Sequence, residues 1–274
     1  MSAIDFERLE KLAEEQRDAF AKADPYPHIV IDDFLPKETA DAVFEEFDRT
    51  EEGWKSYHHY NEAKFALTDV SFMLPDTRRL FEDLQSERFV HLVERLTGAD
   101  DLLADPDLDG AGLHRLMRDG FLNLHVDFLS HTKNRNWSRQ VNLLLYLNRG
   151  WHDEWGGELE LWDEKLTHCV RSVTPQFNRC VIFRTIPGSY HGNPNPVACP
   201  ETESRRSIAL YYFRDEGRTQ RIEPTNYRGR PSDPLYKKAL IHVDRGLLRV
   251  YSVLKRYTPI DDRLVSRVLK RLGR

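Results

Sequence analysis

The sequence predicts a mainly β protein of α+β organisation, in which a sandwich or barrel-like double sheet is flanked by helices. Between residues 119 and 213, short β-rich runs alternate with turn signals such as NRGW, EWGG, TPQFN and PNP, a spacing typical of a double sheet. On both sides of this region, apolar residues recur at helical intervals. The chain has 274 residues, enough to bury one large core, and it shows no internal repeat. We therefore expect a single domain over residues 1–274.

Helical patterns dominate the residues before this region. Residues 4–22 read as an amphipathic helix, and residues 37–50 read as a second one. Between them, PYPHIVIDDFLP is a short β-rich run bracketed by prolines. Helical spacing returns over residues 76–104. Residues 1–118 are thus expected to hold the N-terminal helices and the first strands.

Residues 53–75 are aromatic and irregular, with the polar stretch SYHHYNEAK at their centre. One interpretation is a lid or substrate-facing loop, since functional loops combine irregular sequence with exposed aromatic side chains. In that case Tyr57, His58 and Tyr60 contact the substrate. The alternative is that these aromatic residues pack against helices.

The central region is expected to contain seven strands. They are predicted over residues 120–128, 139–148, 157–163, 168–173, 180–185, 189–193 and 205–213. A link punctuated by Pro and Gly then runs to about residue 235. Helical spacing follows in LYKKALIHVDRGLLRVYSVLKRY and again in IDDRLVSRVLKRLG.

The composition is that of an ordinary globular protein, with 40% hydrophobic and 31% charged residues. No apolar run approaches the ~20 residues that a membrane-spanning helix needs. The first residues form a charged helical pattern without the apolar centre of a signal peptide. The three cysteines show no CxxC spacing, so neither a disulfide framework nor a zinc knuckle is indicated. A cytoplasmic location is the simplest expectation.

Charge is unevenly distributed along the chain. Residues 214–274 carry 16 Lys and Arg against 7 Asp and Glu, a local charge of +9, so the other residues carry −14 of the total of −5. A basic segment can bind an anionic partner. We favour the other interpretation, helices with basic residues on their solvent face, because Leu, Val and Tyr are interleaved with the charges. No nucleic acid is expected as a partner, and the oligomeric state is left open.

The stretch LNLHVDF, residues 122–128, suggests a metal site. His125 and Asp127 are two apart in a predicted strand, so both side chains point to the same face. A third ligand is available in His191, within GSYHGNPNP. Two imidazoles and one carboxylate leave about three positions open, which suits non-haem Fe(II). A structural zinc site would instead need four protein ligands, usually including cysteine thiolates.

A later strand offers a site for an anion. In SRRSIALYYF, alternate residues place Arg205, Ser207 and Tyr211 on one face. The planar guanidinium of arginine binds a carboxylate bidentately, and a buried arginine is costly without an anionic partner. A dicarboxylate cosubstrate would supply that partner. Arg206 points the other way and is expected to be a solvated charge.

Three further histidines have no partner pattern in the sequence. They are expected to be surface residues: His131, His152 and His168.

The order of these motifs resembles a known family. The run HVD, VNLLLYLNRGWHDEWGGELELWDE, VTPQFNRCVIFRT, YHGNP and RRSIALYYF is similar to the Fe(II)/2-oxoglutarate-dependent oxygenases of the prolyl 4-hydroxylase type. The resemblance covers residues 119–213 and, more loosely, PHIVIDDFLPKETADAVFEEF. It implies a double-stranded β-helix core of the jelly-roll or cupin type over residues 119–213, with residues 214–274 as a basic helical extension.

The resemblance also implies roles for individual residues. The iron ligands would be His125, Asp127 and His191. Arg205 would pair with the distal carboxylate of 2-oxoglutarate, assisted by Tyr146 and Ser207, and Tyr211 would face the substrate.

Two departures from the family pattern lie near this site. Where relatives often have a tyrosine three residues before the first histidine, this chain has Leu122, so Asn123 is expected to help hold the cosubstrate instead. In addition, Gly192 and Asn193 follow the third ligand, where better-known members have an apolar residue at the second position.

The implied activity is hydroxylation of an unactivated C–H bond. Its requirements would be Fe(II), 2-oxoglutarate and O2, with ascorbate as an optional reductant, and 2-oxoglutarate would be decarboxylated to succinate and CO2. The substrate is either a small molecule, such as an amino acid, a sugar or a biosynthetic intermediate, or a prolyl residue of a peptide segment. A third alternative is a non-catalytic, cupin-like protein that binds a ligand. The complete set of metal ligands together with Arg205 argues against it.

Overall fold

The computed structural model describes residues 2–220 and 225–257, and in the last helix side chains only as far as residue 247. The helices in this part of the chain are α1 (Phe6–Ala21), α2 (Lys37–Arg49), α3 (Pro75–Leu84), α4 (Glu87–Thr97), α5 (Leu235–Tyr257) and the short 3₁₀ turns η1 (Val70–Phe72) and η2 (Asp153–Trp155). The strands are β1 (His28–Ile31), β2 (Lys55–His59), β3 (Glu62–Leu67), β4 (Leu102–Ala104), β5 (Gly112–Leu116), β6 (Phe121–Val126), β7 (Trp137–Tyr146), β8 (Leu159–Trp162), β9 (Cys169–Val173), β10 (Arg179–Arg184), β11 (His191–Asn193), β12 (Arg205–Asp215) and β13 (Asn226–Tyr227).

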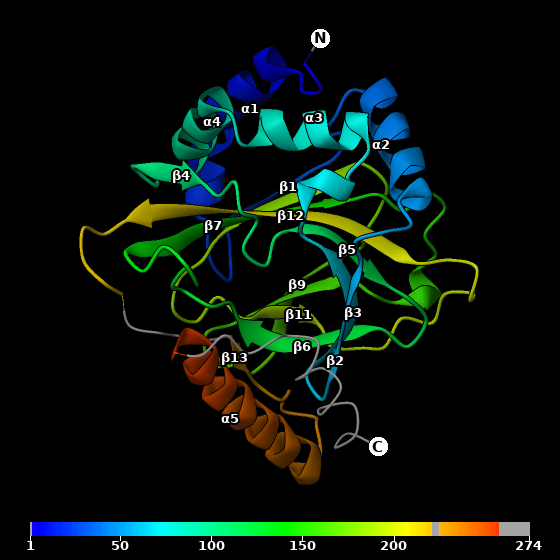
Figure 1. The fold of residues 1–274 in the computed structure, drawn as a ribbon, viewed down its shortest axis with the longest axis vertical. Helices are drawn as coiled ribbons and strands as arrows, with labels where there is room; N and C mark the ends of the chain where they lie inside the picture. Colours follow the sequence, from blue (N-terminus) through cyan, green and yellow to red (C-terminus); the bar gives the residue numbers. More distant parts are fainter. Residues whose placement is uncertain (1, 221–224, 258–274) are drawn as a thin grey trace.

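These strands form one antiparallel sheet that folds over on itself into a nearly closed barrel (Figure 1). Its path runs β1-β10-β7-β12-β5-β3-β6-β11-β8-β9. The first five strands of this path make one wall and the last four make the other, with β3 joining the two walls. The expected double-stranded β-helix core with flanking helices is confirmed.

Side-chain alternation in β7 shows how the wall separates two cores. Val141, Leu143 and Leu145 pack into the large core that the sheet shares with the N-terminal helices. Leu144 and Tyr146, on the opposite face, contact the smaller core inside the barrel. A strand that is apolar on both faces is therefore buried between a helical layer and a second sheet.

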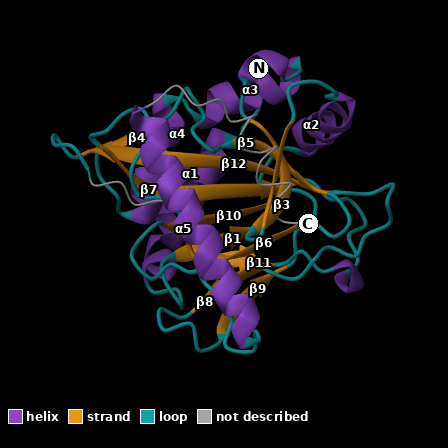
Figure 2. Ribbon diagram, turned by 60° about the horizontal axis from the view of Figure 1, so that its bottom comes forward, coloured by secondary structure: helices purple, strands orange, loops and turns teal. Residues whose placement is uncertain are grey.

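The helices lie at opposite ends of the molecule. Figure 1 places α1–α4 together over the wall that contains β7 and β12, and α5 at the other end beside β13. Figure 2 brings α5 to the front. Among the described residues no helix combines the length and the apolar composition that a membrane span requires.

Local sequence explains where these helices begin and end. Asp5 and Ser86 act as N-caps, because their side chains accept hydrogen bonds from the Arg8 and Phe89 amides. α3 begins with Pro75 in its first turn, where the missing amide hydrogen of proline does no harm. α4 ends at Gly98 in the left-handed conformation.

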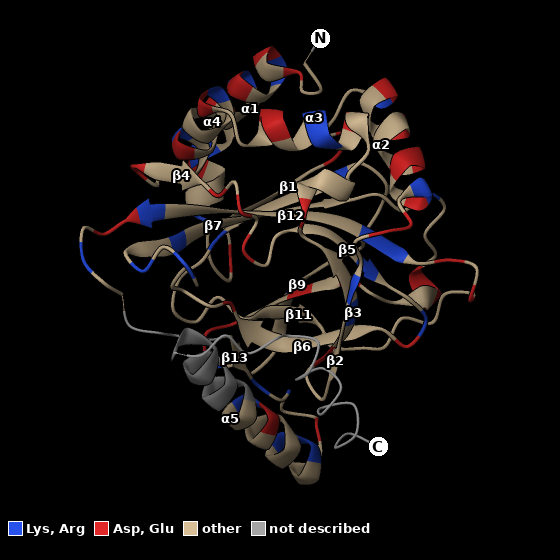
Figure 3. Ribbon diagram, in the orientation of Figure 1, with Lys and Arg blue, Asp and Glu red and all other residues tan. Residues whose placement is uncertain are grey.

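The basic segment near the C-terminus does not form a single patch in the described residues. In Figure 3 the coloured part of α5 carries both acidic and basic residues, and Asp244 of this helix is buried. This arrangement favours the solvent-face interpretation. The second expected helix, IDDRLVSRVLKRLG, lies outside the described residues.

Residues 53–75 differ from the expectation of an irregular loop or of packed helical aromatics. β2 and β3 form a regular hairpin with Lys55 opposite Ala66 and His59 opposite Glu62. β3 continues into the sheet by pairing with both β5 and β6. The prediction of an irregular lid or loop was wrong because hydrogen bonding to two neighbouring strands fixes this segment in the barrel, although Glu62 and Lys64 of β3 face the cavity.

The helical stretch expected over residues 76–104 is also interrupted. It consists of α3 and α4, which are separated by Gln85 and Ser86, and it ends with β4, which pairs with β12. Ser86 caps the second helix, so the change of direction is encoded locally.

A glycine allows β3 to approach β5 closely. Gly112 has a φ of +116°, and a Cβ at this position would lie 2.1 Å from the Leu67 carbonyl oxygen. Any side chain here would clash with the backbone of β3. Gly112 therefore helps to join the two walls of the barrel.

Candidate active site

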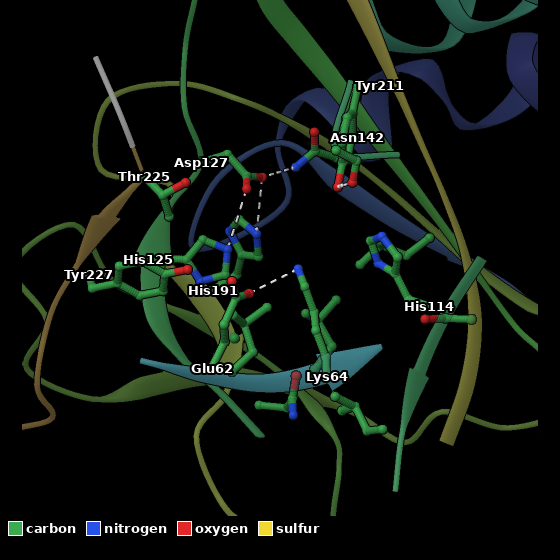
Figure 4. Close-up of a pocket in the computed structure, with 18 of the residues that line it drawn as sticks. Glu62, Lys64, His114, His125, Asp127, Asn142, His191, Tyr211, Thr225 and Tyr227 are labelled. Atoms are coloured by element: carbon green, nitrogen blue, oxygen red, sulfur yellow. Dashed lines mark hydrogen bonds and ion pairs between the residues drawn. The ribbon is translucent and has the colours of Figure 1, made fainter. Parts of the chain in front are cut away.

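One cavity of about 230 Å³ opens between the two walls of the barrel. It is lined by residues of β6, β7, β11 and β12, by β3 and β5, and by the segment that leads into α5. Figure 4 shows the lining side chains converging on the space between His114 and three metal-competent residues.

The three sequence-predicted metal ligands meet on one side of this cavity. His125 on β6 lies directly opposite His191 on β11, and their ring centroids are 4.4 Å apart. Asp127 follows β6, with its carboxylate oxygens 3.4 Å from His125 Nε2 and 3.3 Å from His191 Nε2. One ligand atom from each residue lies within 4.8 Å of the others.

Hydrogen bonds to the backbone leave both imidazoles ready for a metal. His125 Nδ1 lies 2.8 Å from the Asn123 carbonyl oxygen, and His191 Nδ1 lies 3.0 Å from the Ser189 carbonyl oxygen. Because a carbonyl only accepts, each Nδ1 carries the proton and each Nε2 presents its lone pair toward Asp127. Burial and the neighbouring His191 lower the pKa of His125, which also favours the neutral ligand form. The donor set fits Fe(II).

Arg139 and Asn142 of β7 hold the carboxylate of Asp127. Arg139 Nη1 lies 3.0 Å from Asp127 Oδ2, and the Asn142 amide donates to the same oxygen. The Arg139 guanidinium, which is fully buried, stacks on the rings of Phe128 and Tyr211. Burial opposes ionisation of Asp127, but the charge of Arg139 holds its pKa well below the usual value.

Two β-bulges place several of these residues. Opposite Asn193 and His191, β6 uses one extra residue between Leu122 and His125. Opposite Tyr212 and Phe213, β7 uses an extra residue between Arg139 and Val141. A bulge changes which side chains face inward, so strict alternation from the sequence fails near the metal ligands.

The bulge in β6 determines which of two neighbouring residues, Leu122 or Asn123, faces the cavity. Leu122 lines the cavity. The side chain of Asn123 instead donates to the Tyr60 carbonyl and to the Asn61 side chain and is absent from the residues that line the cavity. The structure therefore does not bring Asn123 to the expected cosubstrate site.

Arg205, Tyr146 and Ser207 form a polar end of the cavity. Arg205 Nη2 lies 3.3 Å from the Tyr146 hydroxyl, and Arg205 Nε donates to the Gly157 carbonyl oxygen at 2.6 Å. Ser207 pairs with Tyr146 across the strands and lines the cavity beside Arg205. Arg205 is 6% exposed, and within the described residues it forms no ion pair with a carboxylate. Its charge thus fits an anionic ligand such as 2-oxoglutarate.

Strands β3 and β5 carry cavity-lining residues that sequence reasoning missed. Glu62 and Lys64 of β3 and His114 of β5 line the cavity, and Lys64 Nζ lies 3.0 Å from Glu62 Oε2. The alternation of EAK in β3 could have indicated two inward-facing charges. This alternation is hard to recognise because the aromatic residues around EAK do not suggest a strand.

The segment that leads into α5 completes the cavity. Tyr227 of β13 pairs with His125 of β6, and the two rings are 5.5 Å apart. Thr225 also lines the cavity. No sequence pattern indicates this contribution, since two paired residues are too few for a periodic pattern.

The four predicted substrate contacts divide into two groups. Tyr211 lines the cavity, and the Tyr57 ring lies 5.8 Å from Lys64 Nζ. His58 is exposed on the hairpin. Tyr60 is 36% exposed. Its partial burial raises the pKa of its hydroxyl, and so do Tyr236 of α5 and Asp233, which precedes that helix. Tyr57, His58 and Tyr60 are all absent from the residues that line the cavity.

Two expectations about surface charges were wrong. Arg206 is buried at 8% exposure, because its guanidinium forms a two-point ion pair with Asp48 of α2. His131 is also buried, with Nε2 3.2 Å from Asp105 Oδ2 and Nδ1 accepting from the Asn134 amide.

The two other histidines without a partner pattern are exposed as expected. They are His152 and His168.

Comparison with known proteins gives the same family as the motifs. Residues 111–213 match the family model described as the 2OG-Fe(II) oxygenase superfamily, where 2OG is 2-oxoglutarate. No curated protein matches the sequence.

Solved structures share the fold at low sequence identity. A prolyl hydroxylase from Trichoplax adhaerens, in complex with a peptide fragment of the hypoxia inducible factor oxygen degradation domain, is 19% identical, covers 77% of this chain and 91% of its own, and has a TM-score of 0.55. A Pseudomonas putida prolyl-4-hydroxylase is 17% identical over 75% of this chain and 98% of its own, with a TM-score of 0.55. A prolyl 4-hydroxylase from Phytophthora capsici is 23% identical, covers 77% of this chain and 66% of its own, and has a TM-score of 0.54.

The family match spans β5 to β12, the region that holds His125, Asp127, His191 and Arg205. The prolyl 4-hydroxylase-like resemblance read from the sequence is therefore confirmed. Residues 111–213 match the 2OG-Fe(II) oxygenase superfamily model, and the solved structures show that the chain has a prolyl hydroxylase-like fold.

Proposed function

We propose that this chain hydroxylates an unactivated C–H bond of a small substrate group bound in the cavity. In the overall reaction the C–H bond becomes C–OH, O2 supplies one oxygen atom to this hydroxyl and the other to succinate, and 2-oxoglutarate loses CO2. The observation that carries the proposal is the His125, Asp127 and His191 cluster, within 4.8 Å, sharing one cavity with the uncompensated Arg205.

The chain's own residues position the reactants. The Nε2 atoms of His125 and His191 and the carboxylate of Asp127 would hold iron, while Arg205 and the Tyr146 hydroxyl would bind the distal carboxylate of 2-oxoglutarate. When bound, iron and 2-oxoglutarate together supply the oxidising chemistry that acts on the C–H bond.

The cavity's remaining walls control water and ligand orientation. Leu144, Leu159 and Phe183 give the cavity an apolar lining that limits water near the reacting atoms. Arg139 keeps Asp127 ionised and oriented, as described above. Orientation by such a supporting residue commonly changes metal affinity by about 10–100-fold.

The size of the cavity supports a small reacting group. Its volume of about 230 Å³ must accommodate the cosubstrate and the part of the substrate that reacts. A free small molecule or one side chain of a peptide meets this condition. The Trichoplax adhaerens neighbour is a prolyl hydroxylase bound to a peptide, so the peptide alternative, a prolyl residue, also belongs in the test.

The experiment measures succinate formation by the full chain. Protein prepared without oxygen is loaded with Fe(II) and 2-oxoglutarate, then exposed to O2 with amino acids, sugars or Pro-containing peptides, each with and without ascorbate. We expect one class to stimulate succinate formation and to gain 16 mass units, roughly the mass of one oxygen atom. Absence of 2-oxoglutarate turnover in every case, with Asp127→Ala and Arg205→Ala indistinguishable from the unaltered protein, would reject the proposal.

Two broader proposals accompany this one. Residues 1–274 act as one catalytic unit, since β13 pairs with β6, the strand that carries His125, and α5 packs against β13. The protein works in the cytoplasm, a proposal supported by its three free cysteines, of which Cys180 and Cys199 are buried. Localisation of the tagged full chain by cell fractionation tests the second point.

A further inference from the structure

We propose that Lys64 binds an anionic group, a carboxylate or phosphate, on the substrate that is hydroxylated. This inference rests on the proposed function and narrows its substrate class. It makes Lys64 a specificity-determining residue that is separate from the arginine assigned to 2-oxoglutarate.

The position of Lys64 comes from the pairing of β3. Ala66 pairs with His114 on β5, and Glu62 pairs with Leu122 on β6, so Lys64 lies where β3 joins the two walls. Its side chain is 19% exposed and lines the cavity. Figure 4 shows its amine directed into the space between the metal ligands and His114.

Lys64 ends a chain of alternating buried charges. Asp244 of α5 lies 2.8 Å from His59 Nδ1, His59 Nε2 lies 2.9 Å from Glu62 Oε1, and Glu62 Oε2 lies 3.0 Å from Lys64. Although burial opposes protonation, the two carboxylates raise the pKa of His59 to about 9. Each inner member of this chain therefore has opposite charges on both sides.

Lys64 itself has a carboxylate on one side only. Among the described residues Glu62 is its sole ion-pair partner, and Glu62 divides its charge between Lys64 and His59. Burial opposes the charged form, yet Glu62 raises the pKa of Lys64 above the usual value, so the ammonium persists at neutral pH. An ammonium has three N–H donors and Glu62 is the one carboxylate of the described residues that is paired with it, so an anion in the cavity could accept a further hydrogen bond from Lys64.

The neighbouring His114 provides a second unsatisfied polar group on the same wall. Its Nε2 is buried without a hydrogen-bond partner in the described part of the chain. Burial and the charge of Lys64 lower the pKa of His114 to about 3, so the ring is neutral. A buried unpaired nitrogen beside a lysine is expected to interact with a polar ligand or with water.

The charges of 2-oxoglutarate do not account for Lys64. This dicarboxylate would place one carboxylate at Arg205, and the other is available to the metal. The sheet order β12-β5-β3 puts the strand of His114 between those of Arg205 and Lys64. Lys64 is therefore a third cationic centre, and the hydroxylated substrate is the remaining ligand that could neutralise it.

The test compares charged and neutral versions of the same probe. The full chain is loaded with Mn(II) and 2-oxoglutarate, so that binding is measured by calorimetry without turnover. The probes are the common amino acids, each as the free acid and as the amide, acetylated Pro-Gly as acid and amide, and glucose with glucose 6-phosphate. For the best-binding pair we expect at least a tenfold preference for the anionic member.

Three variants test whether Lys64 is the cause of this preference for the anionic probe. Lys64→Met should reduce it to less than twofold, Lys64→Arg should retain it, and Lys55→Met, at an exposed lysine of the same hairpin, should leave it unchanged. The Kd for 2-oxoglutarate should stay within twofold in all three. Thermal unfolding of each loaded variant checks that the fold is intact.

The possible failures are distinguishable. If the unaltered protein binds Mn(II) and 2-oxoglutarate but shows no anion preference, or if the preference survives Lys64→Met, the Lys64 proposal is wrong and the proposed function stands. A Kd for 2-oxoglutarate that rises tenfold in Lys64→Met would assign the ammonium to the cosubstrate and also reject the proposal. Failure to bind Mn(II) and 2-oxoglutarate at all would reject the proposed function itself.

Discussion

The two walls of the cavity use buried charge in different ways. On the metal side, backbone carbonyls fix His125 and His191, and their Nε2 atoms are directed at an open site. On the hairpin side, His59, Glu62 and Lys64 mostly neutralise one another. The metal side holds its groups ready for ligands. The hairpin side is a structural network of charges, with one end in the cavity. Burial of charge alone therefore does not indicate which residues bind ligands.

The largest effect should follow removal of a metal ligand. Asp127→Ala deletes a donor atom and leaves Arg139 buried without its carboxylate. We expect Mn(II) affinity to fall at least about a hundredfold, and the free energy of unfolding of the metal-free protein to fall by about 3–5 kcal/mol, as when one partner of a buried ion pair is removed. Calorimetry and denaturant unfolding measure the two quantities.

Asp127→Asn serves as the matched control. It keeps the shape and loses the charge, so metal affinity should also fall while packing around Arg139 changes less. Metal binding by Asp127→Ala that equals that of the unaltered protein would show that the cluster is not the metal site.

The adjacent arginines of β12 offer a sharper comparison, because both are buried and they face opposite sides of the sheet. Arg205→Met should raise the Kd for 2-oxoglutarate by about 10–100-fold, since a hydrogen bond to a charged group contributes about 1.5–3 kcal/mol. Arg206→Met should leave that Kd within twofold. It should lower the free energy of unfolding by about 1–3 kcal/mol, because its partner Asp48 belongs to α2.

Calorimetric titration of 2-oxoglutarate into both variants, with Mn(II) present, decides this point. Equal losses of 2-oxoglutarate affinity would mean that Arg205 acts only by stabilising the sheet.

The metal ligands and Arg205 could be predicted from the sequence because these residues follow motifs with fixed spacing. His125, Asp127, His191 and Arg205 lie in strands whose apolar alternation is clear, and the family resemblance supports the same positions. Arg139 was missed because the bulge in β7 changes the inward-facing residue. The same kind of irregularity in β6 explains why Asn123 does not reach the cavity.

The hairpin side of the cavity could not be predicted because it depends on contacts between residues that are distant in sequence. The β2–β3 hairpin becomes part of the barrel only through pairing with β5 and β6. His59 is buried with Asp244, which is 185 positions later in the chain. Arg206 and His131 were assigned to the surface for the same reason, since Asp48 and Asp105 are distant in sequence.

The charge network on the hairpin wall should make stability depend on pH. Folding raises the pKa of His59 from the ordinary histidine value of 6.5 to about 9, so the folded state binds more protons than the unfolded state between these values. The resulting stabilisation is complete below pH 6.5 and is lost as the pH rises through about 9. We expect the free energy of unfolding to fall by about 1–3 kcal/mol over this window.

His59→Gln removes the titrating ring and should flatten the dependence over the same window. Denaturant unfolding at several pH values, on metal-free protein, provides the measurement. The same slope in the unaltered protein and in His59→Gln would show that the His59 network does not stabilise the fold through its charge.

The smallest effects separate neighbouring residues of the hairpin itself. His58 is exposed and does not line the cavity, so His58→Ala should change the affinity for the best anionic probe less than twofold. Tyr57 lies opposite Lys64 across the hairpin, with the Lys64 amine 5.8 Å from its ring centre. Tyr57→Leu removes a cation–π contact that helps to hold the Lys64 amine in place, so it should weaken that affinity about two- to fivefold. Calorimetry on both variants tests the difference, and a larger loss in His58→Ala than in Tyr57→Leu would mean that the substrate approaches from the outer face of the hairpin rather than through the cavity at Lys64.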